Sequence, residues 1–348
     1  MVKTEEGKGI SGMTLADRLR FACAMMALAA TSASQAEVFD LPGDGDTVVG
    51  QVTTVVSQEW DTLLDIARRH GLGYYDIVRA NPEVDPWLPG DGTRVILPTR
   101  FVLPDVPWEG VVLNLPEYRM YYFPPADPDG ARTVMTFPIS IGRMDWETPL
   151  GMTRVTRKAK NPAWYPPESV RQEHEADGRS LPRVVPPGPD NPLGQFAMRL
   201  AIPGYLIHGT NKPAGVGMRV THGCIRMFPE DIEFVFERIP VDTPVRIIDE
   251  PYKFGWYDGQ LLMEAHPPLE TVSSEGEESG GPEPVTVSPL TRLTRLFVSA
   301  TEGREVEVDW GLVESVHVEA DGVPRRIDSA AGEDVLLADK KTPRRARR

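Results

Sequence analysis

One histidine- and cysteine-containing segment carries the residue types that nucleophilic catalysis needs. Cys224 is one of two cysteines in the chain; His222 stands two positions before it and His208 sixteen positions before it. A cysteine attacks as thiolate, and a nearby histidine can take the thiol proton and later return it to a leaving amine. Residues i and i+2 of an extended segment share a face, so His222 can approach Cys224 directly. His208 can do so only if the glycine-rich stretch 209–217 turns the chain back. The spacing alone leaves open which histidine is the base.

The neighbours of the thiol add two further functions that acyl transfer requires. Gly223 permits close approach of a substrate to the backbone, and its N–H and that of Cys224 are candidate donors to an oxyanion. Arg226 can bind a substrate carboxylate through its forked guanidinium. The alternative for each residue alone is structural, because a lone buried cysteine is more often a packing residue and His208 can be a core histidine.

A zinc site is the other chemistry that these side chains allow. His208, His222 and Cys224 with one water would match a catalytic zinc. No second cysteine is available, however, and the nearest carboxylates, Glu230 and Asp231, fit the start of the following helix. We therefore expect no metal and no cofactor.

The N-terminal segment predicts export. Two arginines, an apolar run over 21–30 and small residues ending in SQA precede Glu37, which indicates a cleavable signal peptide over 1–36. The acidic start MVKTEEGKGISG fits such a signal poorly and favours initiation at Met13; a short buried helix is the alternative. Cys23 lies in the segment to be removed, so the mature chain is expected to keep one thiol in an oxidising compartment.

Composition excludes two classes of protein. The 348 residues suggest about two domains. The formal net charge of −14 argues against a nucleic-acid-binding protein, which needs a basic face. No later stretch of 18 or more apolar residues is present, so we expect no transmembrane span in the mature protein.

Residues 51–98 are predicted to form a self-contained unit of strand, helix, helix and strand. This order resembles a LysM module, and the matching residues are DTL at 61–63, IA at 66–67, NP at 81–82 and PGDGTRVILP. The family's usual GDTL stands here as WDTL. The resemblance implies binding to N-acetylglucosamine polymers, which means peptidoglycan for an exported bacterial protein; a spacer without sugar affinity is the alternative.

Residues 107–250 begin with strand-like segments and include a proline-rich excursion over 161–192, which we interpret as a lid or a disordered loop. In this region HGT followed by THGCIRM resembles the catalytic domain of the L,D-transpeptidases, the YkuD type. Thr221 stands where the family more often has serine. The fold class that follows is mainly β (α+β), with a β-sandwich-like catalytic domain.

The resemblance assigns a role to each residue of the motif. It implies that Cys224 is the nucleophile, His208 the general base and acid, and His222 an orienting neighbour. The oxyanion or orienting residues would be Gly223, Gly209 and Thr221, and the substrate-binding residues would be Arg226, Thr210, Asn211 and Trp164.

The implied reaction is acyl transfer in the periplasm. The thiol would attack a tetrapeptide stem at the L-centre of diaminopimelate, release D-alanine and form a thioester. An amine would resolve this thioester, either the lysine of an outer-membrane lipoprotein or a second stem; hydrolysis is also open. A non-catalytic wall-binding protein that uses its LysM module is the alternative from another class.

The C-terminal part is predicted to hold a small appended element over 251–327, reached in part through an acidic linker, and a basic disordered tail over 328–348. We interpret the six Lys and Arg among the last nine residues as a solvent-exposed tail. Attraction to anionic lipid or wall polymer is the alternative.

Overall fold

The computed structural model describes residues 37–43, 45–143, 146, 148–269 and 289–329. The predicted signal peptide with Cys23, the acidic linker over 271–284 and all but two residues of the basic tail lie outside this range. Within it, no helix has the length and apolar character that crossing a membrane requires.

Residues 51–98 have the predicted order of elements: β3 (Thr53–Val56), α2 (Leu63–Arg69), α3 (Tyr74–Ala80) and β4 (Arg94–Leu97). Thr62 caps α2, because its hydroxyl accepts from the Asp65 N–H at 3.1 Å while the Asp65 carboxylate accepts from the Thr62 N–H at 3.1 Å. Asn81 joins α3 to β4: its amide donates to the Ile96 carbonyl and accepts from the Ile96 N–H. Within the DTL motif Thr62 therefore caps a helix, and within the NP motif Asn81 connects α3 to β4 by hydrogen bonds.

The expectation that this segment is self-contained is wrong. Its apolar residues form one buried cluster with side chains of β5 (Arg100–Val102), β6 (Gly110–Asn114), β7 (Arg119–Phe123) and β8 (Thr133–Pro138). Its backbone also meets the loop between His208 and Cys224, where the Tyr74 N–H donates to the Val216 carbonyl at 3.0 Å. A Cβ on Gly217 would lie 2.3 Å from the Tyr74 nitrogen, so this close approach requires glycine.

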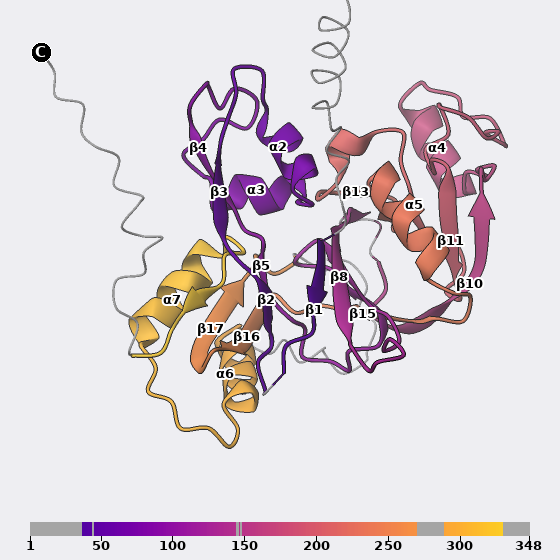
Figure 1. Ribbon diagram of the computed structural model, residues 1–348. Coiled ribbons are helices and arrows are strands. Elements are labelled where there is room, and N and C mark those ends of the chain that lie inside the picture. Colours follow the sequence, from indigo (N-terminus) through magenta and orange to yellow (C-terminus); the bar gives the residue numbers. More distant parts are fainter. Residues whose placement is uncertain (1–36, 44, 144–145, 147, 270–288, 330–348) are drawn as a thin grey trace, which may run out of the picture. The chain divides into compact units, whose positions relative to one another are not determined.

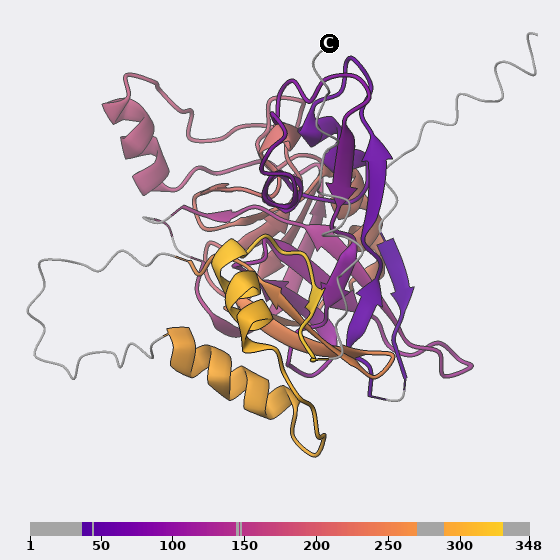
Figure 2. The same ribbon diagram turned by 90° about the vertical axis from the view of Figure 1, so that its left-hand side faces the viewer.

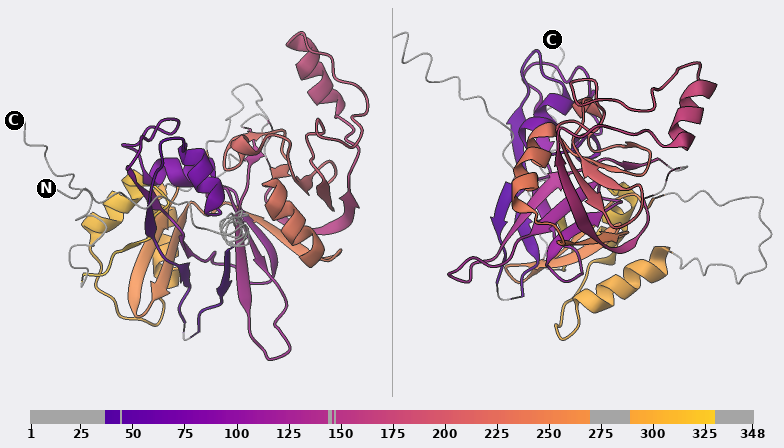
Figure 3. Two further views of the ribbon diagram at one scale, coloured as in Figure 1. Left: turned by 45° about the horizontal axis from the view of Figure 1, so that its top comes forward. Right: turned by 90° about the vertical axis from the view of Figure 1, so that its right-hand side faces the viewer.

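Nine strands form one continuous curled sheet (Figures 1 and 3). Most neighbours are antiparallel, while β6 with β15 and β12 with β14 are parallel. The predicted predominance of strands in an α+β chain is confirmed. The strand order is β1 (Glu37–Asp40), β8, β7, β6, β15 (Pro244–Ile248), β10 (Gly151–Lys160), β11 (Phe196–Leu200), β12 (Leu206–His208) and β14 (Ile225–Arg226).

Helix α5 (Pro229–Arg238) lies along β11 in Figure 1 and buries Ile232, Val235 and Phe236 in the main apolar cluster, together with Ile239 just after it. Two short pairs complete this region. They are β2 (Val48–Gly50) with β5, and β9 (Ile141–Gly142) with β13 (Arg219–Thr221).

The C-terminal element has an apolar cluster of its own. It is built on a three-stranded sheet and two helices, which are coloured orange to yellow in Figure 2. These elements are β16 (Tyr252–Tyr257), β17 (Gln260–Ala265), α6 (Pro289–Ala300), α7 (Trp310–Glu319) and β18 (Arg325–Arg326).

A buried guanidinium connects α3 to the main sheet. Arg119 of β7 is fully buried, and its Nη2 lies 2.6 Å from an Asp76 carboxylate oxygen of α3. Its charge also stands 4.2 Å from the centre of the Phe101 ring. A charge in this position needs a partner, because desolvation costs several kcal/mol for an unpaired ion.

We expect Asp76→Asn to lower the free energy of unfolding by about 3 kcal/mol, since it removes the carboxylate 2.6 Å from the buried Arg119 charge and leaves Glu117, at 3.8 Å, to compensate it. Urea denaturation measures this loss. Asp91→Asn, which changes an exposed carboxylate in the same segment, is the control and should unfold like the wild type. Equal midpoints for the two variants would contradict the role given to Asp76.

Candidate active site

The parallel pairing of β12 with β14 places His208 and Cys224 on one face of the sheet. Ile207 is opposite Ile225 and His208 is opposite Arg226. Cys224 immediately precedes β14 and so stands opposite Leu206, which shares a face with His208. The two residues are diagonal neighbours at a Cα separation of about 7 Å by strand geometry. Both line one cleft of about 1030 Å³.

His208 is buried and held in one orientation. Its Nδ1 lies 2.6 Å from the Gly209 carbonyl oxygen; since a carbonyl only accepts, Nδ1 carries the hydrogen and Nε2 keeps its lone pair. Burial lowers the pKa of His208 to about 4, with the charge of Arg226 acting in the same direction. The imidazole is therefore neutral at pH 7 and able to accept a proton.

Cys224 is a half-buried free thiol. Burial raises its pKa above the ordinary value, while the Leu206 N–H and the Arg226 charge act to lower the pKa. The Sγ atom lies 3.5 Å from the Gly204 carbonyl oxygen, which fits a protonated thiol that donates. The resting pair is consequently a neutral thiol with a neutral imidazole.

The loop that carries the thiol is fixed by two hydroxyl groups. Thr221 donates to the Cys224 carbonyl at 2.6 Å, and Thr148 donates to the Gly223 carbonyl at 2.9 Å. Gly223 has φ 92°, and a Cβ there would lie 2.9 Å from the Tyr205 ring, so the position requires glycine. Among the described residues, the N–H groups of Gly223 and Cys224 have no hydrogen-bond partner. They are thus available to a developing oxyanion.

His222 bonds to a residue that the sequence did not single out. Its Nε2 lies 2.8 Å from a carboxylate oxygen of Glu173, which stands on α4 (Glu168–Ala176) within the predicted excursion. The other oxygen of Glu173 accepts from Arg143 at 2.7 Å. The Trp146 and His222 rings pack in a T-shaped arrangement, with their centroids 5.2 Å apart. Glu173 therefore joins α4 to the wall of the cleft; its one sequence signal is its place in a long polar loop.

The predicted substrate-binding residues divide into two groups. Trp164, Asn211 and Arg226 line the cleft, and the Nε of Arg226 is buried without a partner among the described residues. Thr210 is buried instead, and its hydroxyl accepts from the Lys212 N–H at 2.9 Å within a turn. The structure does not bring Thr210 to the cleft surface.

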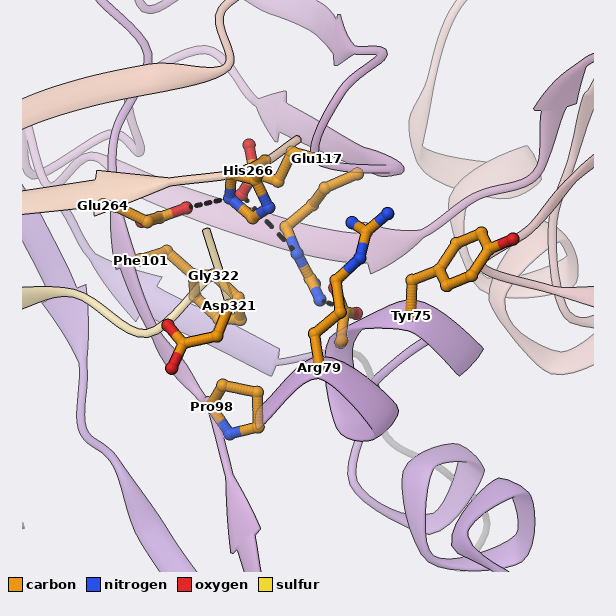
Figure 4. Close-up of a pocket in the computed structure, with 11 residues that line it drawn as sticks. Tyr75, Arg79, Pro98, Phe101, Glu117, Glu264, His266, Asp321 and Gly322 are labelled. Atoms are coloured by element: carbon orange, nitrogen blue, oxygen red, sulfur yellow. Dashed lines mark hydrogen bonds and ion pairs between the residues drawn. The ribbon is translucent and has the colours of Figure 1, made fainter. Parts of the chain in front are cut away.

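A second cluster of titratable groups lies apart from the cleft and surrounds a small cavity of about 10 Å³ (Figure 4). Glu117, Glu264 and His266 have the spacing of metal ligands. The Lys253 ammonium, however, lies 2.9 Å from Glu117 and 2.8 Å from Glu264, and His266 lies 2.7 Å from Glu264. The lysine already supplies the cation, so we assign this cluster a structural role.

Comparison with known proteins identifies relatives over most of the chain. Residues 109–247 match the family described as the L,D-transpeptidase catalytic domain, YkuD. The chain is 38% identical over 314 residues to the probable L,D-transpeptidase YbiS of Escherichia coli (strain K12), covering 88% of this chain and 97% of that protein. It is 39% identical over 296 residues to the probable L,D-transpeptidase ErfK/SrfK of the same strain, covering 84% and 92%. A solved L,D-transpeptidase from Mycobacterium smegmatis is similar at 19% identity and a TM-score of 0.31, over 43% of this chain and 62% of that one.

The neutral resting pair predicts how Cys224 reacts with iodoacetamide. Only the thiolate reacts, and the thiol pKa is raised, so the alkylation rate should climb continuously from about pH 6 to about pH 10. Intact mass with peptide mapping at Cys224 measures it. A rate that reaches its plateau by about pH 6 would show a preformed thiolate and imidazolium pair and contradict this electrostatic description.

The double contact of Glu173 predicts that Glu173→Gln releases α4, because the neutral amide cannot form the ion pair with Arg143. Hydrogen exchange over residues 168–176 should become faster. Glu175→Gln changes an exposed carboxylate of the same helix and serves as the control. If both variants exchange at the wild-type rate, Glu173 does not hold the helix.

Proposed function

Since the chain belongs to the L,D-transpeptidase family, we propose that it transfers acyl groups of peptidoglycan stems with Cys224 as nucleophile and His208 as general base and acid. The observation that carries this proposal is the placement of the two side chains on one face, in one cleft. A neutral His208 with a free Nε2 beside a protonated thiol is the starting state that general-base activation needs.

The first half-reaction forms a thioester. The Cys224 sulfur attacks the carbonyl at the L-centre of diaminopimelate in a tetrapeptide stem while His208 takes the thiol proton. The N–H groups of Gly223 and Cys224 donate to the oxyanion. His208 then gives its proton to the departing amine, the C–N bond breaks and D-alanine leaves.

The second half-reaction resolves the thioester. An acceptor amine attacks the same carbonyl, His208 takes a proton from the amine, and the C–S bond breaks. The thiolate recovers its proton from His208, which restores the resting pair. A lipoprotein lysine, the amine of a second stem and water are the acceptors that this chemistry admits.

Arg226 is assigned to a substrate carboxylate close to the reacting bond. Its side chain lines the cleft, stands opposite His208, and has a buried Nε without a partner among the described residues. Burial lowers the pKa of Arg226, as expected for a cation that awaits an anion. Trp164 and Asn211 line the same cleft and complete the donor site.

We infer that the remaining regions direct this reaction to the wall. Residues 51–98 are assigned as a LysM module for glycan strands, and residues 1–36 as the signal peptide of a periplasmic protein. The catalytic domain is assigned to 107–250, and its curled sheet is compatible with the β-sandwich-like fold that the resemblance implies.

The test uses a carbapenem as acyl donor, and intact mass as readout. Wild type should gain the mass of one ertapenem, while Cys224→Ala should gain none; His208→Ala should acylate more slowly because the base is absent. Muropeptide analysis with stems then identifies the product as protein-linked, dimeric or trimmed. A folded wild type without an adduct would contradict the enzymatic function and favour a wall-binding protein that acts through 51–98.

A further inference from the structure

Two arginines extend the row of residues that contains the thiol. Across the sheet, Arg157 of β10 is opposite Arg199 of β11, and Arg199 is opposite Leu206 of β12. Leu206 is in turn opposite Cys224, so all four side chains lie on one face, and all four line the cleft. With about 4.8 Å between neighbouring strands, the Cα atom of Arg199 lies about 10 Å, and that of Arg157 about 14 Å, from the Cα atom of Cys224.

A β-bulge turns Arg157 to this face. Val155 is fully buried, and regular alternation would point Arg157 to the same inner side. The register of β10 with β11 shifts between Val155 and Arg157, which reverses the direction of the second side chain. Thr156 stabilises the shift through a hydrogen bond to the Arg199 carbonyl at 3.1 Å. Bulges of this kind commonly re-aim a side chain next to a functional site.

The pair is electrostatically unfavourable as it stands. Like charges directly opposite each other destabilise a sheet. Among the described residues, neither Arg157 nor Arg199 has an acidic partner, although the chain has a net charge of −14. Other basic side chains nearby are paired: Arg154 with Asp242 and Lys160 with Glu237, for example.

The next row supplies room for a ligand. It runs from Ala159 through Ala197 and His208 to Arg226, and all four residues line the cleft. The small alanine side chains leave open space beside the two arginines, in line with His208.

We propose that Arg157 and Arg199 form a second carboxylate-binding subsite of the cleft, for a carboxylate of the bound stem or of the acceptor. The inference rests on the proposed function, because a stem peptide carries such carboxylates and so does an acceptor that ends in lysine. A carboxylate bound between the two guanidinium groups removes their repulsion and accepts from both.

The experiment separates the two sources of the carboxylate by measuring each half-reaction. The donor arm compares acylation of Cys224 by a tetrapeptide stem with acylation by the same stem whose glutamate α-carboxyl is amidated. The acceptor arm compares transfer to Nα-acetyl-lysine with transfer to Nα-acetyl-lysine amide. The variants are Arg157→Gln, Arg199→Gln and the double variant, and Arg154→Gln on the same strand is the matched control.

A donor subsite predicts about a tenfold loss of the acylation kcat/KM with the free acid and little change with the amide. An acceptor subsite predicts the same pattern in the transfer step alone. Variants that match Arg154→Gln in both arms would overturn the proposal. Failure of the proposed function is distinguishable, because wild type would then not acylate at all. Thermal melting confirms that each variant is folded, and either single variant suffices if the double variant is not.

Discussion

The parallel register of β12 and β14 is the constraint on which the cleft depends. A shift of one residue would turn Cys224 to the opposite face from His208 and remove Arg226 from its position opposite the histidine. β14 is only two residues long, so pairing alone cannot hold this register. The loop before it is held separately, by the Thr221 and Thr148 hydroxyl groups. The position of the thiol is therefore fixed jointly by the strand pairing and by the two hydroxyl hydrogen bonds.

The segment 51–98 also contacts the loop that precedes Cys224. It shares a buried cluster with the sheet, pairs Asp76 with Arg119, and bonds through Tyr74 to the loop that connects β12 to β13. A module that was only tethered would leave this loop free. Here residues 51–98 and the loop before Cys224 are packed against each other, so the two parts of the chain are structurally connected.

Local patterns in the sequence predicted those features of the structure that depend on residues close together in the chain. The alternation of strand-like and helix-like segments predicted the elements of 51–98, and the motif around Cys224 named side chains that line the cleft. What depends on long-range packing was not predictable. Glu173 stands on a helix with a single buried residue, Val170, and so shows no apolar stripe. The shared core, the burial of Thr210 and the bulge at Arg157 follow from pairings between distant strands.

Strand pairing across the whole chain also governs how this protein acquires its structure. β1 pairs with β8, β6 with β15, and the Thr47 N–H donates to Trp256 in the C-terminal element. The nine-stranded sheet is therefore complete only when residues 37–248 are all present. High contact order of this kind makes folding slow, and a chain that emerges from its N-terminus cannot close the sheet until β15 has appeared. The sheet that carries the cleft is therefore completed only late in synthesis, after residues 244–248 have emerged.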